Sequence, residues 1–173
     1  GYSGLHLFKI DDNQNIQYID KITGFNESSR FFEEDMNGNI WVGQYYKGLY
    51  QLKLSNNLKE VTVKIISDEN SSPSYDQIVL SRVNNDLIIA TKTGVYEIDQ
   101  LNQSIVTSER FSKVVGKQQV YLFEQDNQKN IHIVAENLIG FFKQISTNNY
   151  VFVPSSLHHL RYYLNNDLLQ ISI

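Results

Sequence analysis

The chain of 173 residues contains no cysteine, two prolines, one methionine and one tryptophan. Without cysteine it has no disulfide, no thiolate nucleophile and no cysteine-ligated zinc site. None of its apolar runs approaches the roughly 20 residues with which a helix crosses a bilayer, so we expect no direct membrane insertion. A net charge of −4 argues against nucleic acid as a partner.

Aromatic residues are frequent, with 11 tyrosines and 9 phenylalanines. Together with Ile and Val they favour β-strands. No stretch shows a sustained period of 3.6 residues, which is the pattern typical of amphipathic helices. The composition therefore predicts a protein built from strands.

A glycine followed by alternating apolar and polar residues recurs at Gly4, Gly48, Gly94 and Gly140. The spacings are 44, 46 and 46 residues, which is the period of one four-stranded propeller blade. Each of the last three glycines follows a turn rich in Asn and Asp and then an apolar segment. We predict an all-β fold of β-propeller blades with four antiparallel strands each, namely three complete blades plus partial blades at the two ends.

We interpret residues 1–173 as a single β-propeller domain or propeller segment. The predicted blade units are 1–23 (partial), 30–66, 78–111, 120–153 and 160–173 (partial). The two partial units are able to complete each other, because residues 166–171 read onward into residues 1–5 recreate an internal unit. The alternative is a segment of a larger propeller.

Residues 32–43, continuing through Lys47-Gly48-Leu49-Tyr50, resemble the two-component regulator propeller repeat, which occurs in sensor regions of bacterial hybrid two-component regulators. The resemblance implies a periplasmic sensor domain that takes part in signal transduction through a kinase outside this chain. It also implies carbohydrate sensing, with glycan breakdown products as ligands. By position in that repeat, the innermost strands are expected at 30–34, 78–83, 120–125 and 160–164.

No catalytic motif stands out in the sequence: it has no Ser-His-Asp order, no Gly-rich phosphate loop and no metal motif. Asp35-x-Asn37-x-Asn39 faintly resembles a calcium loop, but capping of a turn by the Asp side chain is the favoured interpretation. His132 stands where Trp41 stands in the repeat, so we expect both rings to pack within the stack of sheets. We expect no catalytic residue, no metal and no cofactor.

The candidate ligand-binding residues lie in loops that a propeller gathers on one face. Tyr with amide and charged side chains suits a polyhydroxylated ligand, because the ring covers C–H faces while polar groups bond hydroxyls. The candidates are Tyr45, Tyr46, Lys47, Tyr75, Lys92, Glu136 and His158, and Gln119 is expected beside them.

We therefore predict a non-catalytic ligand-sensing propeller module. Its expected partners are a small molecule such as an oligosaccharide, neighbouring blades or domains of the parent protein, and a second copy of the chain. One alternative is a propeller glycosidase or lyase fragment, which requires carboxylates of several innermost strands to converge. The other is a protein-interaction or assembly module.

Overall fold

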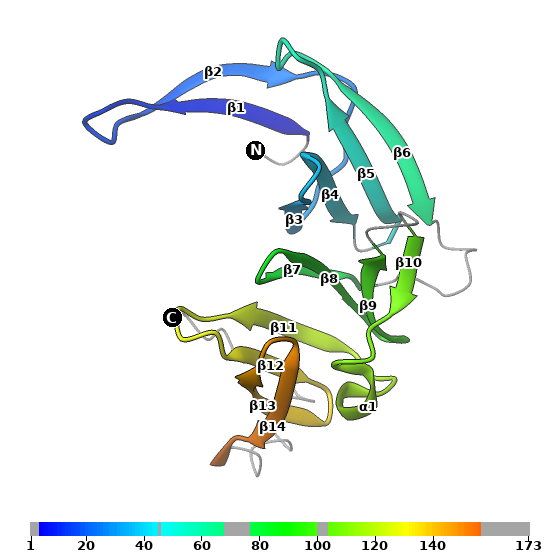
Figure 1. Ribbon diagram of the computed structural model, residues 1–173. Coiled ribbons are helices and arrows are strands. Elements are labelled where there is room, and N and C mark those ends of the chain that lie inside the picture. The colour runs from blue at the N-terminus through cyan, green and yellow to red at the C-terminus, as the bar shows by residue number, and fades with distance from the viewer. Residues whose placement is uncertain (1–3, 45, 68–76, 100–103, 157–173) are drawn as a thin grey trace.

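The computed structural model describes residues 4–44, 46–67, 77–99 and 104–156. Most of them lie in β-strands, which form one hairpin and three four-stranded sheets arranged in an arc (Figure 1). The hairpin consists of β1 (Leu5–Ile10) and β2 (Ile16–Ile22). The predicted all-β fold class is confirmed by these antiparallel, blade-like sheets.

Within each four-stranded sheet, every strand pairs antiparallel with its neighbours in sequence. The strands are, in the first sheet, β3 (Phe31–Glu34), β4 (Asn39–Gln44), β5 (Gly48–Leu54) and β6 (Val61–Ser67); in the second, β7 (Val79–Val83), β8 (Asp86–Thr91), β9 (Gly94–Asp99) and β10 (Ser104–Thr107); and in the third, β11 (Val120–Gln125), β12 (Ile131–Ala135), β13 (Leu138–Ser146) and β14 (Asn149–Pro154). The first and third sheets begin and end within one residue of the predicted units 30–66 and 120–153. The predicted partial unit 160–173 lies outside the described residues.

The segment after β10 differs from the expectation that a strand runs to residue 111. The strand ends at Thr107, and a single helical turn, α1 (Ser112–Val115), follows. Phe111 and Val115 are buried between the second and third sheets, so the chain leaves the sheet edge to fill that space. None of the helices among the described residues has the length and apolar character needed to cross a membrane.

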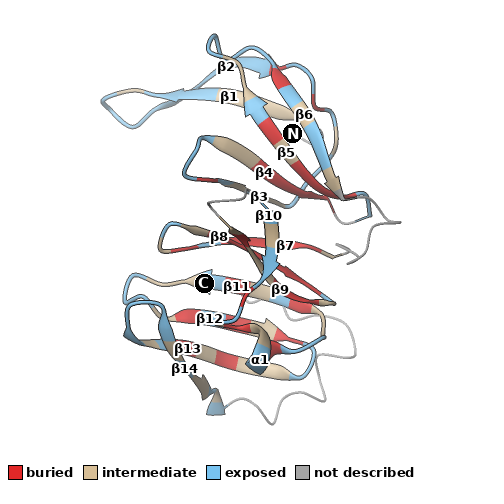
Figure 2. Ribbon diagram, turned by 45° about the vertical axis from the view of Figure 1, so that its right-hand side comes forward, coloured by how far each residue is buried: buried red, intermediate tan, exposed pale blue. Residues whose placement is uncertain are grey.

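Strand β8 of the middle sheet buries both of its faces, because alternate residues point toward different neighbouring sheets. On β8, Leu87 and Ile89 join the cluster against the first sheet, whereas Ile88 and Ala90 join the cluster against the third. Figure 2 shows the resulting runs of buried residues in the middle strands of the stack. Burial on both faces explains why this strand reads as a continuous apolar run in sequence.

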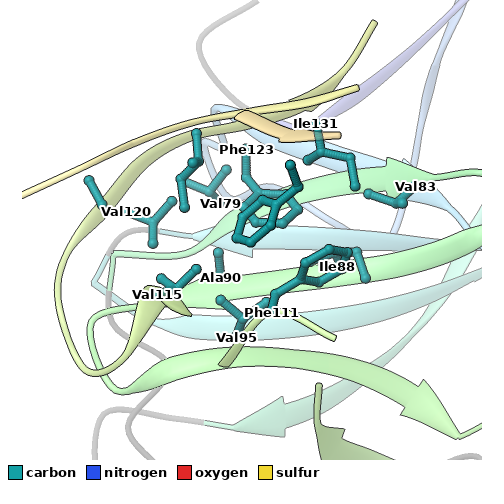
Figure 3. Close-up of a cluster of buried hydrophobic side chains, with 13 residues drawn as sticks. Val79, Val83, Ile88, Ala90, Val95, Phe111, Val115, Val120, Phe123 and Ile131 are labelled. Atoms are coloured by element: carbon teal, nitrogen blue, oxygen red, sulfur yellow. The ribbon is translucent and has the colours of Figure 1, made fainter. Parts of the chain in front are cut away.

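The largest of these clusters lies between the second and third sheets (Figure 3). The ring of Phe111 stands edge-on to Phe123, with centroids 5.2 Å apart, and lies 5.1 Å from the ring of Phe142. Edge-to-face aromatic pairs add about 0.5–1.5 kcal/mol beyond the burial of their area. The cluster therefore fixes the spacing of the two sheets whose loops border the site described below.

The first strands of the three sheets, β3, β7 and β11, occupy neighbouring inner positions of the arc. Strand β7 contacts both β3 and β11. The outer strands β6, β10 and β14 each form the opposite edge of their sheet. The order predicted from the repeat, with residues 30–34, 78–83 and 120–125 innermost, agrees with this arrangement.

The turn between β3 and β4 is organised by the Asp35 carboxylate. Its Oδ1 accepts the backbone N–H groups of Asn37 and Asn39 at 2.8 and 2.9 Å, and its Oδ2 accepts the Trp41 Nε1–H at 2.8 Å. Burial raises the pKa of Asp35, but the hydrogen bonds, led by that of Trp41, outweigh it and hold the pKa below its usual value. The carboxylate thus caps the turn, as predicted.

Asp126 forms the same cap between β11 and β12. Its Oδ1 accepts the N–H groups of Gln128 and Asn130, and His132 Nε2 lies 2.9 Å from its Oδ2. The His132 ring takes the bonding role of Trp41, but its side chain is 49% exposed. The expectation that His132 packs within the stack is wrong, because no described sheet covers this face of the third sheet.

The recurrent glycine serves two different structural needs. Gly4, Gly48 and Gly94 have φ angles of 77°, 94° and 149°, which side chains rarely adopt. Gly140 is required by close packing instead, since a Cβ there would lie 2.4 Å from the Val153 carbonyl oxygen. Glycine thus recurs at this repeat position either because the backbone has a positive φ or because a neighbouring backbone atom leaves no space for a Cβ.

We expect Trp41→Phe to lower the free energy of unfolding by about 1–3 kcal/mol, because it removes a buried donor to a charged acceptor. Urea denaturation monitored by circular dichroism measures this change at an unaltered m-value. The matched variant is His132→Phe, which removes the equivalent bond at an exposed position and should cost less than about 1 kcal/mol. Equal losses of unfolding free energy in Trp41→Phe and His132→Phe would contradict a larger contribution from the buried Trp41 hydrogen bond.

Asp126 makes a pH-dependent contribution to stability. The hydrogen bond from His132, supported by those from Asn130 and Gln128, lowers the pKa of Asp126 to about 2. A carboxyl with a lowered pKa stabilises the fold above its unfolded value of about 4 and loses this effect as the pH falls toward 2. The melting temperature of Asp126→Asn should therefore lie below that of the unmodified protein at pH 6, and the gap should close between pH 4 and 2.

Candidate functional site

The site is built from the loops on one side of the sheets. We define the loop face as the connections from second to third strands and the segments that cross from one sheet to the next. Its described residues are 24–30, 44, 46–48, 91–94, 112–119 and 135–138. Residues of both kinds of connection line common hollows.

The larger hollow, here called the Lys92 hollow, lies between the second and third sheets. Its volume is about 600 Å³. The lining residues are Gln77, Lys92, Thr93, Lys117, Gln118, Gln119, Tyr121 and Glu136. The structure thus brings together the predicted candidates Lys92 and Glu136, with Gln119 beside them.

Two glutamine side chains of the Lys92 hollow are held by backbone groups. Gln118 Oε1 accepts the Asn137 N–H at 2.7 Å, and its Nε2 donates to the Val115 carbonyl. Gln119 Nε2 donates to the carbonyl oxygens of Gln77 and Val120 at 3.2 and 2.7 Å. These bonds join the segment before β7, α1 and the loop after β12, so they order the wall of the hollow.

One polar atom in this wall has no partner among the described residues. The Oε1 of Gln119 is buried and accepts no hydrogen bond from them. A buried acceptor left unpaired costs about 1–3 kcal/mol. Such a group is an exception in protein interiors, and a water molecule or another polar group is able to satisfy it.

The Lys92 hollow combines charge, amides and one aromatic ring. Its lining includes two residues with ammonium groups, Lys92 and Lys117, and one with a carboxylate, Glu136. The Tyr121 ring is exposed on β11. Ammonium and amide groups donate to hydroxyl or carboxylate oxygens, Glu136 accepts from hydroxyls, and the ring offers a flat apolar surface. This set of groups suits a polyhydroxylated molecule.

A second hollow of about 490 Å³, here called the Tyr46 hollow, lies between the first and second sheets. Its lining includes Ser29, Arg30, Gln44 and the exposed ring of Tyr46. Gln44 Oε1 accepts the Tyr46 N–H at 2.7 Å and thereby shapes the loop. The predicted candidate Tyr46 is therefore on the loop face but in a different hollow from Lys92.

Lys47 lies in neither hollow. Its ammonium is 2.8 and 2.9 Å from the two carboxylate oxygens of Glu27. The hydrogen bond with Glu27 raises the pKa of Lys47, so the ammonium stays charged. The structure gives this predicted site residue an ion pair that ties the loop after β4 to the segment after β2.

Three predicted candidates, Tyr45, Tyr75 and His158, lie outside the described residues. Conversely, the prediction omitted lining residues that the structure supplies, namely Gln77, Lys117, Gln118, Tyr121 and Arg30. Lys117 and Gln118 belong to a crossing segment that the sequence already placed on this face. Tyr121 was not recognisable, because the sequence of a strand does not state which of its two faces borders a hollow.

A separate group of charges joins the three innermost strands. Arg82 Nε on β7 lies 3.7 Å from Glu33 Oε2 on β3. Burial raises the pKa of Glu33; the charge of Arg82 opposes this, and the Glu124 carboxylate on β11 adds to it. Among the described residues no group of three or more His, Cys, Asp or Glu side chains is arranged to hold a metal ion.

No protein-family model matches the chain, and no curated protein matches its sequence. Among solved structures it is similar to virginiamycin B lyase from Staphylococcus aureus, with 11% identity and a TM-score of 0.49 over 87% of this chain and 49% of the lyase. It is also similar to the extracellular domain of a protein described as a one-component system from B. thetaiotaomicron, with 13% identity and a TM-score of 0.49 over 88% of this chain. The chain spans about half of the lyase and 20% of that domain. Likenesses of this size transfer neither activity nor ligand.

The hydrogen bonds of Gln118 generate a prediction about local order. Gln118→Ala removes the acceptor of the Asn137 N–H. If that hydrogen bond contributes about 1.4 kcal/mol, the Asn137 amide should exchange its hydrogen about ten times faster in the variant. Amide exchange measured by NMR tests this. Lys117→Ala, which removes a neighbouring side chain without that bond, should leave the Asn137 rate unchanged. A global loss of protection in Gln118→Ala would contradict a local role.

Proposed function

We propose that this chain is a non-catalytic ligand-recognition module of a bacterial signalling protein. The ligand, a small oligosaccharide, binds in the Lys92 hollow. The observation that carries the proposal is the convergence of Lys92, Glu136 and Tyr121 with backbone-anchored glutamines on the loop face. Its volume of about 600 Å³ is within the 300–1,000 Å³ typical of small-molecule sites.

The position of the hollow supports a sensing role. Its walls come from two sheets, since Lys92 follows β8 and Glu136 follows β12. A ligand that contacts both walls stabilises one relative placement of the two sheets over others. A ligand controls a signal only if it binds one arrangement of the sheets more tightly than another.

The resemblance of residues 32–43 to the two-component regulator propeller repeat supports the signalling context. In that context the module lies in the periplasm and transmits ligand binding, through neighbouring domains or a second copy, to a kinase outside this chain. The non-catalytic assignment rests on the Lys92 hollow, whose described lining holds one carboxylate, that of Glu136. Acid–base hydrolysis of a glycoside uses two.

One observation favours a second candidate function, glycoside cleavage at the innermost strands. Glu33 and Glu124 come from two of these strands and interact electrostatically, and burial raises the pKa of Glu33. A carboxyl with a raised pKa is suited to act as a general acid. Against this role, Arg82 pairs with Glu33, and neither carboxylate lines the Lys92 or Tyr46 hollow.

Thermal unfolding against a panel of neutral and acidic oligosaccharides tests the proposal. One saccharide class should raise the melting temperature, since a ligand at one hundred times its Kd stabilises the folded state by about 2.7 kcal/mol. Lys92→Ala and Tyr121→Ala should each weaken binding at least tenfold. Lys129→Ala, on the turn after β11, is the matched control and should bind normally.

Three results would decide against recognition at this site. Absence of any shift across the panel would reject a saccharide ligand. A shift that survives both Lys92→Ala and Tyr121→Ala would place the ligand elsewhere. Recovery of a shortened saccharide, abolished by Glu33→Gln, would establish the glycosidase alternative.

A further inference from the structure

The Tyr46 hollow is lined by a guanidinium group, that of Arg30. Arg82 and Arg110 each form an ion pair with a carboxylate. Arg30 forms no such pair with the carboxylates of the described residues. The described lining of the hollow contains neither Asp nor Glu, unlike that of the Lys92 hollow. Within this lining the positive charge of Arg30 is therefore unbalanced, and it attracts anions.

Gln44, at the end of β4, brings a second hydrogen-bond donor to this hollow. Its Oε1 accepts the backbone N–H groups of Tyr46 and Lys47 at 2.7 and 2.6 Å, so the other end of the amide is the nitrogen. Gln44 is 9% exposed, and its Nε2 donates no hydrogen bond to the described residues. A donor left unpaired on a buried side chain is an exception in protein interiors. Because Gln44 lines the hollow, an acceptor bound there can take these N–H groups.

The pairing of β3 with β4 brings these two donors together. Phe31 pairs with Gly43 at the end of this antiparallel ladder. Arg30 and Gln44 stand one residue beyond that pair, one on each side, and opposed residues of antiparallel strands point to the same face. Ser29 Oγ donates to the Gly43 carbonyl at 2.7 Å and accepts the Phe31 N–H at 3.2 Å. These bonds hold the chain on both sides of Arg30.

The remaining lining of the hollow is largely apolar or aromatic. It includes Phe31, Ile78 and Tyr46, and Tyr46 is 74% exposed. A Cβ at Gly43 would lie 2.9 Å from Ile78 Cγ2, so Ile78 packs directly against the backbone of β4. Aromatic side chains bind flat apolar groups through their ring faces and edges. The hollow therefore suits a molecule that has both an anionic group and a flat apolar body.

We propose that the Tyr46 hollow binds an aromatic carboxylate, a ligand separate from the saccharide of the Lys92 hollow. The Arg30 guanidinium holds the two carboxylate oxygens by parallel hydrogen bonds, and Gln44 Nε2 donates to one of them. The aromatic body lies against Tyr46 and Phe31. One guanidinium matches a monoanion, whereas a phosphate monoester carries a charge of about −1.5 to −2 and needs a second cation. The volume of about 490 Å³ is that of a small-molecule site.

Binding of 2-naphthoate to the full chain tests the proposal. Calorimetric titration measures the Kd, and NMR locates the site through the backbone amides of Gly43 and Tyr46, whose resonances should shift on binding. The alcohol 2-naphthalenemethanol has the same rings without the charge and should bind at least tenfold more weakly. Arg30→Ala should also weaken 2-naphthoate binding at least tenfold. Because Arg30 is exposed, this variant should fold normally.

Two further variants separate the Gln44 donor from net charge. Gln44→Glu keeps an acceptor for the Tyr46 and Lys47 N–H groups but replaces the donor with a carboxylate oxygen, so it should abolish 2-naphthoate binding. The matched control, Lys59→Ala, removes one positive charge from the turn between β5 and β6, outside both hollows, and should bind normally.

The proposal is overturned by any of four results. These are an unchanged Kd in Arg30→Ala, an equal loss of affinity in Lys59→Ala, equal binding of the alcohol, and tighter binding of inorganic phosphate than of 2-naphthoate. The saccharide panel tests a different hollow, so failure of one proposal leaves the outcome of the other to its own experiment.

Discussion

Burial of both faces of the middle sheet is the constraint on which the rest of this structure depends. Strand β8 shows it most directly, since Leu87 and Ile89 face the first sheet while Ile88 and Ala90 face the third. A sheet that is apolar on both sides is stable only between two others. The order of the sheets, the loop face and both hollows follow from this stacking.

The same constraint explains what happens at the edges of the stack. The His132 side chain is exposed because no described sheet covers its face, although its bond to Asp126 repeats that of Trp41 to Asp35. Phe8 is exposed, and β2 is the single strand among the described residues that pairs with β1. Identical repeat positions therefore differ in burial according to whether a neighbour is present.

Stacking also separates two kinds of site within one scaffold. The loop face lies where sheets meet, so its hollows have walls from two sheets and respond to their spacing. The innermost strands instead gather Glu33, Arg82 and Glu124 from three sheets into one charged group. The charged group and the two hollows therefore lie in different parts of the same stack.

The repeat of glycine, apolar strand and Asn/Asp turn was sufficient to predict four-stranded antiparallel sheets and the carboxylate caps, because these depend on contacts within a few residues. It did not predict the course of residues 108–115, where Phe111 leaves the sheet to fill a gap between sheets. Nor did it predict that Lys92 and Tyr121 line one hollow while Tyr46 lines another. Sequence thus determined the strands and turns of each unit, whereas tertiary structure decided which side chains meet, because packing between sheets joins residues that are distant along the chain.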